Sequence, residues 1–176
     1  MRHRIFLVPL RPDLDPDAAH RHWTAVHAPL FARTPGLRGY VQNRPEPGGH
    51  GWVCSETWFA DADAERGAYA SDFYVHEVTP DESRFLDRGA AWAALVRDGW
   101  MPVRGLPGGY RALVVGWAGD DPPSLRHVEV IALDRAGPNG GPPRLLSAWS
   151  DDPAALSPVL AEPGDVALLT RPAVVL

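Results

Sequence analysis

The sequence predicts an α+β protein built from two tandem units of the order β-α-β-β-α-β, with antiparallel sheets packed face to face. Short apolar segments, some of them alternating between two sets of side chains as strands do, recur along the chain of 176 residues. Segments with helix-start signals lie between them in the first hundred residues. A strand ending at tryptophan and running through aspartates into an alanine-containing helix occurs twice, as SETWFADADAERGAYA and LSAWSDDPAALSPVLA, which indicates a repeat.

The first half contains four expected strands and two helical segments in the ferredoxin-like order. Asp15 is a good N-cap, Pro16 suits the first helical position, and Pro35 with Gly36 ends that helix. Asp61 caps the next helix, and Thr79-Pro80-Asp81-Glu82 has the form of a capping box. The expected elements are a strand at 3–10, a helix at 15–36, strands at 37–44 and 52–59, a helix at 62–71, a helical turn from 79 through 85 and a strand at 91–98.

The second half repeats this order without its first helix. Only GDDPPSLR separates its first two strands, and this segment is too short and too rich in proline for a long helix. We therefore predict a domain at 1–104 that carries the site and a degenerate ferredoxin-like domain at 105–176. An unrelated β-rich extension of the first sheet is the alternative. The expected elements are strands at 110–118, 126–135 and 144–150, a short helix at 151–161 and a strand at 166–176.

Composition excludes several functions. A net charge of −5 without any basic run argues against nucleic acid as a partner, and no apolar run is long enough for a membrane span. All seventeen basic residues are arginine, so no lysine Schiff base can form. The single Cys54 excludes multi-cysteine metal sites, and we expect it to be buried and inert. The N-terminus has no signal peptide, so a cytoplasmic location is expected.

Four segments, HWTAVHAPL, PGLRGYVQNR, ETWF and DESRFLD, occur in an order and at spacings that resemble the EthD-like family of the dimeric α+β barrel group. The resemblance covers residues 1 to about 100. It implies a small enzyme without a cofactor, in ether degradation or in aromatic and polyketide metabolism. It also implies that the substrate lies in the cleft between sheet and helices.

The helix at 15–36 carries the expected site. His20, Trp23 and His27 fall along one stripe of it, and His27 is the first candidate for a general acid or base, although a structural histidine is an equal alternative. Glu56 lies on an aromatic strand face, where a carboxylate is either a functional acid or the partner of an arginine such as Arg4 or Arg38, or of His27. The predicted catalytic residues are His27, Tyr40 and Glu56, and the predicted substrate-binding residues are His20, Trp23, Gln42, Trp58 and Phe85.

No metal and no cofactor are expected. The histidines do not share a metal-binding spacing, and no glycine-rich phosphate loop follows a strand. A haem would need one imidazole in a roomy cavity, which His27 or His76 could supply. Aspartate and glutamate at 81, 82 and 87 are interpreted as capping, exposed residues.

Three functions agree with these observations. The favoured one is a cyclase, dehydratase or isomerase of aromatic or polyketide-type metabolism that works by proton transfer. The alternatives are a cofactor-free monooxygenase acting on an electron-rich aromatic compound and a binding protein without chemistry. In each case the expected ligand is a small hydrophobic or aromatic molecule. The chain is expected to be a monomer with an internal pseudo-dimer, or a homodimer.

Overall fold

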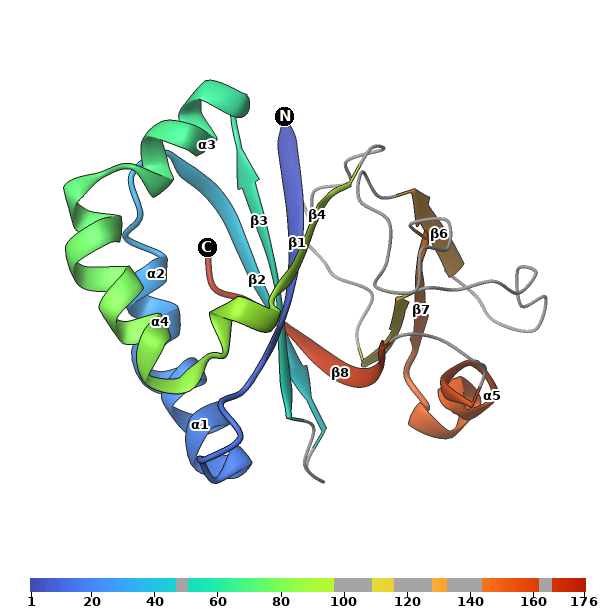
Figure 1. Ribbon diagram of the computed structural model, residues 1–176. Helices are drawn as coiled ribbons and strands as arrows, with labels where there is room; N and C mark the ends of the chain where they lie inside the picture. The colour runs from blue at the N-terminus through green and yellow to red at the C-terminus, as the bar shows by residue number, and fades with distance from the viewer. Residues whose placement is uncertain (47–50, 97–108, 116–127, 133–143, 162–165) are drawn as a thin grey trace.

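A computed structural model describes residues 1–46, 51–96, 109–115, 128–132, 144–161 and 166–176 (Figure 1). Within this part of the chain, eight antiparallel strands form one sheet in the order β4-β1-β3-β2-β8-β5-β7-β6. The predicted boundary at 104 and the segment GDDPPSLR, 119–126, which was expected to be too short for the missing helix, lie outside the described residues. Among the described helices, none has the length and apolarity needed to cross a membrane.

The first half has the predicted order of elements. Its strands are β1 (Arg2–Pro9), β2 (Leu37–Pro45), β3 (Trp52–Phe59) and β4 (Trp92–Leu95). Its helical elements are α1 (Pro16–His22), a π-helical turn η1 (Trp23–His27), α2 (Ala28–Phe31), α3 (Ala62–Tyr69), a second π-helical turn η2 (Tyr74–Val78), α4 (Thr79–Phe85) and the short 3-10 turn η3 (Arg88–Ala90). All of the longer helices cover the same face of the sheet (Figure 1).

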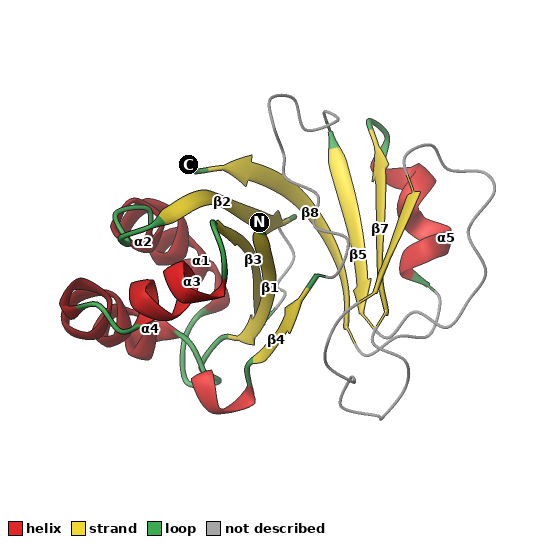
Figure 2. Cartoon of the chain, turned by 90° about the horizontal axis from the view of Figure 1, so that it is seen from above, coloured by secondary structure: helices red, strands yellow, loops and turns green. Residues whose placement is uncertain are grey.

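The second half contributes β5 (Tyr110–Val115), β6 (Val128–Ala132), β7 (Arg144–Ser150), the 3-10 turn η4 (Pro153–Leu156), α5 (Ser157–Leu160) and β8 (Val166–Val174). These elements match the prediction wherever they are described. Leu156 and Val159 pack against Ala112, Val114 and Leu146 on the outer face of this half. The helical layers therefore lie on the two outer sides of the molecule (Figure 2).

The two halves meet along the pair β2 and β8, where Val41 lies opposite Val174. The sheet curls beyond this pair, so that the inner faces of the halves pack on each other. Ile5 and Leu7 of the first half share one core with Leu113, Leu145 and Leu168 of the second. The predicted face-to-face barrel is thus correct, and the two sheets are also continuous through one shared strand pair.

The predicted caps of the first two helices are present. The Asp15 carboxylate accepts hydrogen bonds from the N–H groups of Asp17 and Ala18 at 3.3 Å each. Asp61 accepts from Asp63 at 3.0 Å and from Ala64 at 2.9 Å. After the first helix, Gly36 adopts a φ of 78°, which is the left-handed exit expected of glycine.

Two prolines lie inside helices rather than at their starts. The N–H of Ala28 bonds to the Trp23 carbonyl, and the N–H of Thr79 bonds to the Tyr74 carbonyl, so one wide turn precedes Pro29 and another precedes Pro80. A wide turn accommodates a proline, which has no N–H and whose ring crowds the preceding turn. The predicted capping box is therefore wrong, because Thr79 has helical angles and the helix continues through it.

A buried ion pair connects the halves inside the barrel. Glu56 on β3 accepts a hydrogen bond from Arg111 Nη1 on β5 at 2.5 Å, and Asn43 Nδ2 donates to the same carboxylate at 2.8 Å. His3 Nε2 lies 2.9 Å from its other oxygen, and Arg111 Nε donates to Ser147 Oγ at 2.8 Å. Burial by itself would raise the pKa of Glu56, but the charge of Arg111 and the hydrogen bonds hold that pKa well below its usual range.

We predict that Glu56→Gln lowers the free energy of unfolding by about 3–5 kcal/mol, because it leaves the Arg111 charge buried without a counter-charge. Urea denaturation measures this change, and Glu77→Gln at an exposed position is the control. Since the folded pKa lies below the ordinary 4.5, the wild-type contribution is complete above that pH and is lost as the pH falls further. An unchanged denaturation midpoint in Glu56→Gln would contradict this role.

Candidate functional site

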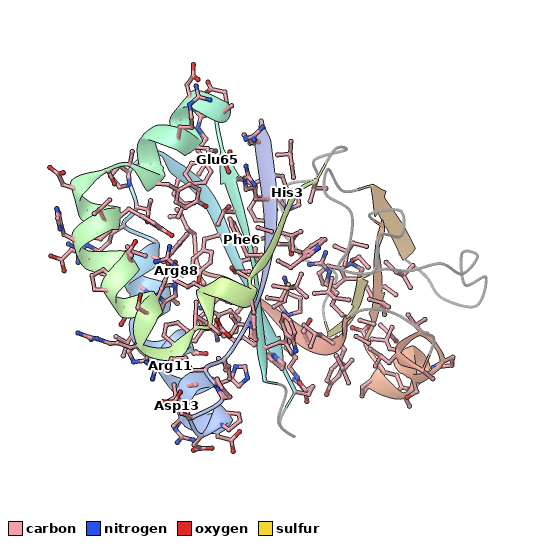
Figure 3. The ribbon with its side chains drawn as sticks, in the orientation of Figure 1. His3, Phe6, Arg11, Asp13, Glu65 and Arg88 are labelled. Carbon is pink, nitrogen blue, oxygen red and sulfur yellow. The ribbon has the colours of Figure 1, made fainter. Side chains whose placement is uncertain are left out.

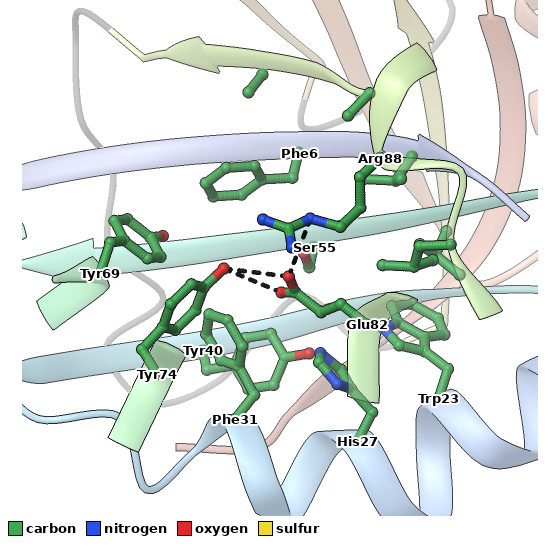
Figure 4. A pocket seen from close by; sticks show the side chains of 15 residues that line it. Phe6, Trp23, His27, Phe31, Tyr40, Ser55, Tyr69, Tyr74, Glu82 and Arg88 are labelled. Carbon is green, nitrogen blue, oxygen red and sulfur yellow. Dashed lines mark hydrogen bonds and ion pairs between the residues drawn. The ribbon is translucent and has the colours of Figure 1, made fainter. Parts of the chain in front are cut away.

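A cavity of about 210 Å³ lies between the helices and the outer face of the first-half sheet (Figure 4). Phe6 and Val53 line it from the strands, and Trp23 and Phe31 line it from the first helical segment. Three tyrosines, at positions 40, 69 and 74, complete most of the aromatic wall. The cavity is thus lined mostly by apolar and aromatic side chains, which suits a small aromatic molecule.

His27 enters this cavity at the end of the first wide turn. Its Nδ1 lies 2.9 Å from Asp81 Oδ2, and His22 Nε2 lies 2.8 Å from the other oxygen of the same carboxylate. An ionised carboxylate only accepts hydrogen bonds, so His27 carries its hydrogen on Nδ1 and its Nε2 has a free lone pair. Burial lowers the pKa of His27, and the opposing effect of Asp81 does not cancel it. A neutral imidazole at neutral pH follows.

Glu82 enters the same cavity from α4. The Tyr74 hydroxyl donates to its two oxygens at 3.1 and 3.2 Å, and Arg88 Nε lies 3.5 Å from Oε2 (Figure 4). Burial raises the pKa of Glu82, while Arg88 and the Tyr74 hydrogen bond lower it by a smaller amount. Burial also raises the pKa of Tyr74, with the Glu82 charge adding to the effect. Tyr74 therefore remains a hydrogen-bond donor, and Glu82 tends toward its neutral acid form.

Tyr40 presents its hydroxyl to the cavity from β2. Gln42 Nε2 donates to this hydroxyl at 3.2 Å and to the Trp23 carbonyl at 2.9 Å, which ties the strand to the first wide turn. Burial raises the pKa of Tyr40, so the phenol stays protonated. Figure 4 shows the hydroxyl beside the imidazole of His27.

The structure brings three of the predicted site residues together, since His27, Tyr40 and Trp23 all line the cavity. Gln42 does not line the cavity, but its two hydrogen bonds just described hold the Tyr40 hydroxyl and the Trp23 backbone in place. Phe85 is buried among the rings of His22 and His27 and does not line the cavity itself. His20 lies edge-on to Trp23 with ring centroids 6.1 Å apart, outside the lining.

Glu56 and Trp58, which were predicted as site residues, lie on the opposite face of the sheet from this cavity. Successive side chains of a strand point to opposite faces, and Ser55, which directly precedes Glu56 on β3, lines the cavity. Glu56 binds Arg111 and His3 rather than Arg4, Arg38 or His27. Trp58 stacks on His3 at 4.2 Å inside the barrel. Cys54 on this face is fully buried, as expected.

Sequence reasoning missed the two acidic residues of α4. Asp81 and Glu82 were expected to be exposed, yet they are 4% and 8% exposed. A signal was present, because Val78, Glu82 and Phe85 follow the i, i+4, i+7 spacing of a buried helix stripe. The resemblance of Thr79-Pro80-Asp81-Glu82 to a capping box concealed this spacing, because it predicted that the acidic residues lie at an exposed helix start. Asp87 is exposed and accepts from the Gly89 N–H at 3.2 Å, in agreement with the prediction.

Within the described residues, no group of three or more His, Cys, Asp or Glu side chains could hold a metal ion. His76, one of the two imidazoles considered for haem, is exposed on the second helix and does not line the cavity. The other, His27, uses Nδ1 to bind Asp81. Its Nε2 is not used by that contact and would face a ligand in the cavity.

We predict that Asp81→Asn lowers the pKa of His27 further, because the carboxylate charge is the influence that raises it. Titration of the His27 ring by ¹H–¹⁵N NMR measures the shift. Asp63→Asn removes a carboxylate that is 85% exposed on α3 and is the control. If Asp81→Asn left the titration of His27 unchanged, the proposed orientation of the imidazole by Asp81 would be wrong.

Comparisons with known proteins agree with the fold. Residues 11–89 match the EthD domain. A putative chlorite dismutase has a TM-score of 0.55 at 12% identity, over 98% of this chain and 95% of that one. An EthD family protein of Bacillus halodurans C-125 has a TM-score of 0.44 at 22% identity, over 57% of this chain and 99% of that one.

A putative monooxygenase of Lactobacillus acidophilus NCFM has a TM-score of 0.48 at 7% identity, over 99% of this chain and 94% of that one. A search of curated proteins finds no match. The cavity and both of its ionisable groups, His27 and Glu82, lie within the matched segment. Residues 11–89 thus match the EthD domain, and the α+β barrel fold in which they lie continues through the second half of the chain.

Proposed function

We propose that this protein is a small enzyme that works without a cofactor and moves protons on an aromatic or polyketide-type substrate. The reaction class is cyclisation, dehydration or isomerisation. One observation carries the proposal. His27 and Glu82 line the same apolar cavity, and their pKa values are displaced toward each other, downward for the histidine and upward for the glutamate. Such a pair can divide the work of proton removal and proton donation between a neutral imidazole and a carboxylic acid.

His27 is the proposed base. Its Nδ1–H is held by Asp81 at 2.9 Å, which fixes the ring and leaves Nε2 to remove a proton from a substrate C–H or O–H. The imidazolium that forms is stabilised by the Asp81 carboxylate. His22, which binds the other oxygen of Asp81, restrains the carboxylate from its second side.

Glu82 is the proposed acid, in the role first assigned to Glu56. In its neutral form it can give a proton to a leaving hydroxyl or to a developing enolate oxygen, and the Tyr74 hydroxyl then stabilises the carboxylate through its hydrogen bonds. Tyr40 is a further neutral donor beside His27 and is suited to hold an enolate oxygen. Trp23, Phe6 and Phe31 supply the ring-binding walls.

The function can be tested before the substrate is known. The aromatic ketone 2-tetralone has acidic hydrogens next to its carbonyl group, and their exchange with D₂O is measured by NMR. We predict that the protein accelerates this exchange and that His27→Gln slows it by about 10²–10⁴-fold. Because the pKa of His27 lies below 6.5, the rate should rise with pH below that value and level off by neutral pH.

His76→Gln, which removes an exposed histidine outside the cavity, is the matched control and should leave the exchange rate unchanged. Glu82→Gln should slow a complete isomerisation or dehydration more than it slows exchange, since the amide cannot supply a proton. Full exchange activity in both His27→Gln and His27→Ala would exclude His27 as the base. Activity that consumes oxygen in metal-free buffer would favour the monooxygenase alternative.

A further inference from the structure

The ionisable side chains that line the cavity differ in the charge that they carry near neutral pH. Among the described residues that line it, Arg88 is the only one with a permanent charge, and the other ionisable side chains are Glu82, His27 and the three tyrosines. The tyrosines have raised pKa values and His27 a lowered one, so these four are neutral near pH 7. Among the described residues of the lining, Glu82 is thus the only possible counter-charge of the Arg88 guanidinium.

The contact between Arg88 and Glu82 is weak. The two atoms lie 3.5 Å apart, whereas charge-assisted hydrogen bonds are usually about 2.7–2.9 Å long. The nearest pair of atoms uses Nε, no hydrogen bond between the two side chains meets the usual geometric limits, and the Arg88 side chain, which lines the cavity, is 44% exposed. The forked face of the guanidinium, which binds carboxylates through two parallel hydrogen bonds, is therefore free to meet a ligand.

The backbone holds Arg88 in this place. The Asp87 N–H donates to the Pro9 carbonyl of β1 at 2.9 Å, and the Asp87 side chain caps the turn η3 through Gly89. Leu86 forms an isolated bridge with Leu10 just before it. The two residues before Arg88 thus fix its backbone to the sheet. The position of Arg88 at the cavity therefore does not depend on its contact with Glu82.

A second polar group lies in the cavity wall. The Tyr69 hydroxyl is buried and makes no hydrogen bond that meets the usual geometric limits within the described part of the chain, although Thr57 lies near enough to lower its pKa slightly against the larger effect of burial. Figure 4 shows Tyr69 across the cavity from Arg88, with Phe6 between them. A buried hydroxyl without a partner is costly, and a ligand oxygen at that point would satisfy it.

We propose that the cavity takes a small aromatic anion, whose carboxylate pairs with Arg88 and whose ring lies among Phe6, Trp23 and Phe31. The inference rests on the proposed function and specifies its substrate class. Arg88 is then a specificity residue. It binds the acidic substituent at the cavity mouth, while the proton chemistry takes place deeper, at His27 and Tyr40. A second oxygen of the substrate meets Tyr69.

Two bicyclic probes of the same shape test this inference, namely 2-naphthoate and its neutral amide, 2-naphthamide. Their dissociation constants are measured at pH 7 by isothermal titration calorimetry. We predict that the wild-type protein binds the anion about 10–100-fold more tightly, the range expected for a hydrogen bond to a charged group. Arg88→Gln should remove this preference, and Arg88→Lys, which keeps the charge but not the fork, should retain part of it.

Arg66→Gln, which replaces an arginine that is 74% exposed on α3, is the matched control and should keep the wild-type preference. Equal affinity of the wild type for the two probes, no binding of 2-naphthoate, or an unchanged preference in Arg88→Gln would each overturn the inference. The tetralone assay is independent of this result. Anion preference without exchange activity would support the substrate class and reject the enzyme, and the reverse would do the opposite.

Discussion

The buried ion pair between Glu56 and Arg111 determines how the two halves of the barrel meet. A charge removed from water must be paired and hydrogen-bonded, so the contacts that Arg111 and Glu56 make require one particular arrangement of the strands around them. Asn43 on β2 binds both members of the pair, and Thr170 on β8 donates to the Arg111 carbonyl at 3.0 Å. The strands that join the halves, β2, β8 and β5, are therefore aligned by the same network that neutralises the charges.

This interaction also explains why the site lies where it does. The ion pair and the shared apolar core fill the inner sheet faces among the described residues, and the cavity lies on the outer face of the first half. Neighbouring residues of strand β3 serve the barrel interior and the cavity in turn, because Glu56 points inward and Ser55 points to the cavity. The polar residues inside the barrel hold it together, and the polar residues outside it, under the helices, are available for chemistry.

The strands, the caps at Asp15 and Asp61, and the role of Gly36 could be predicted because each depends on nearby residues. What could not be predicted depends on distant ones. Glu56 finds its partner 55 residues away in the second half, and no local pattern specifies Arg111. The burial of Asp81 and Glu82 depends on which way α4 faces, which the packing of α4 and the wide turn before Pro80 fix together. The part of the candidate site on the first helix, with Tyr40 of β2, was thus visible from sequence, and the part on α4 was not.

The two wide helical turns connect fold and site. Each precedes a proline, and each inserts an extra residue into its helix, so the residues that follow are rotated by about 100° relative to a regular helix. Beyond η2 this rotation decides that Asp81 and Glu82, rather than their neighbours, face the first helix and the cavity. At η1, Trp23 and His27 enter the lining from the same turn. Pro29 and Pro80 make regular helices unfavourable at these two places, so the facing of the residues that follow depends in part on two prolines that do not themselves line the cavity.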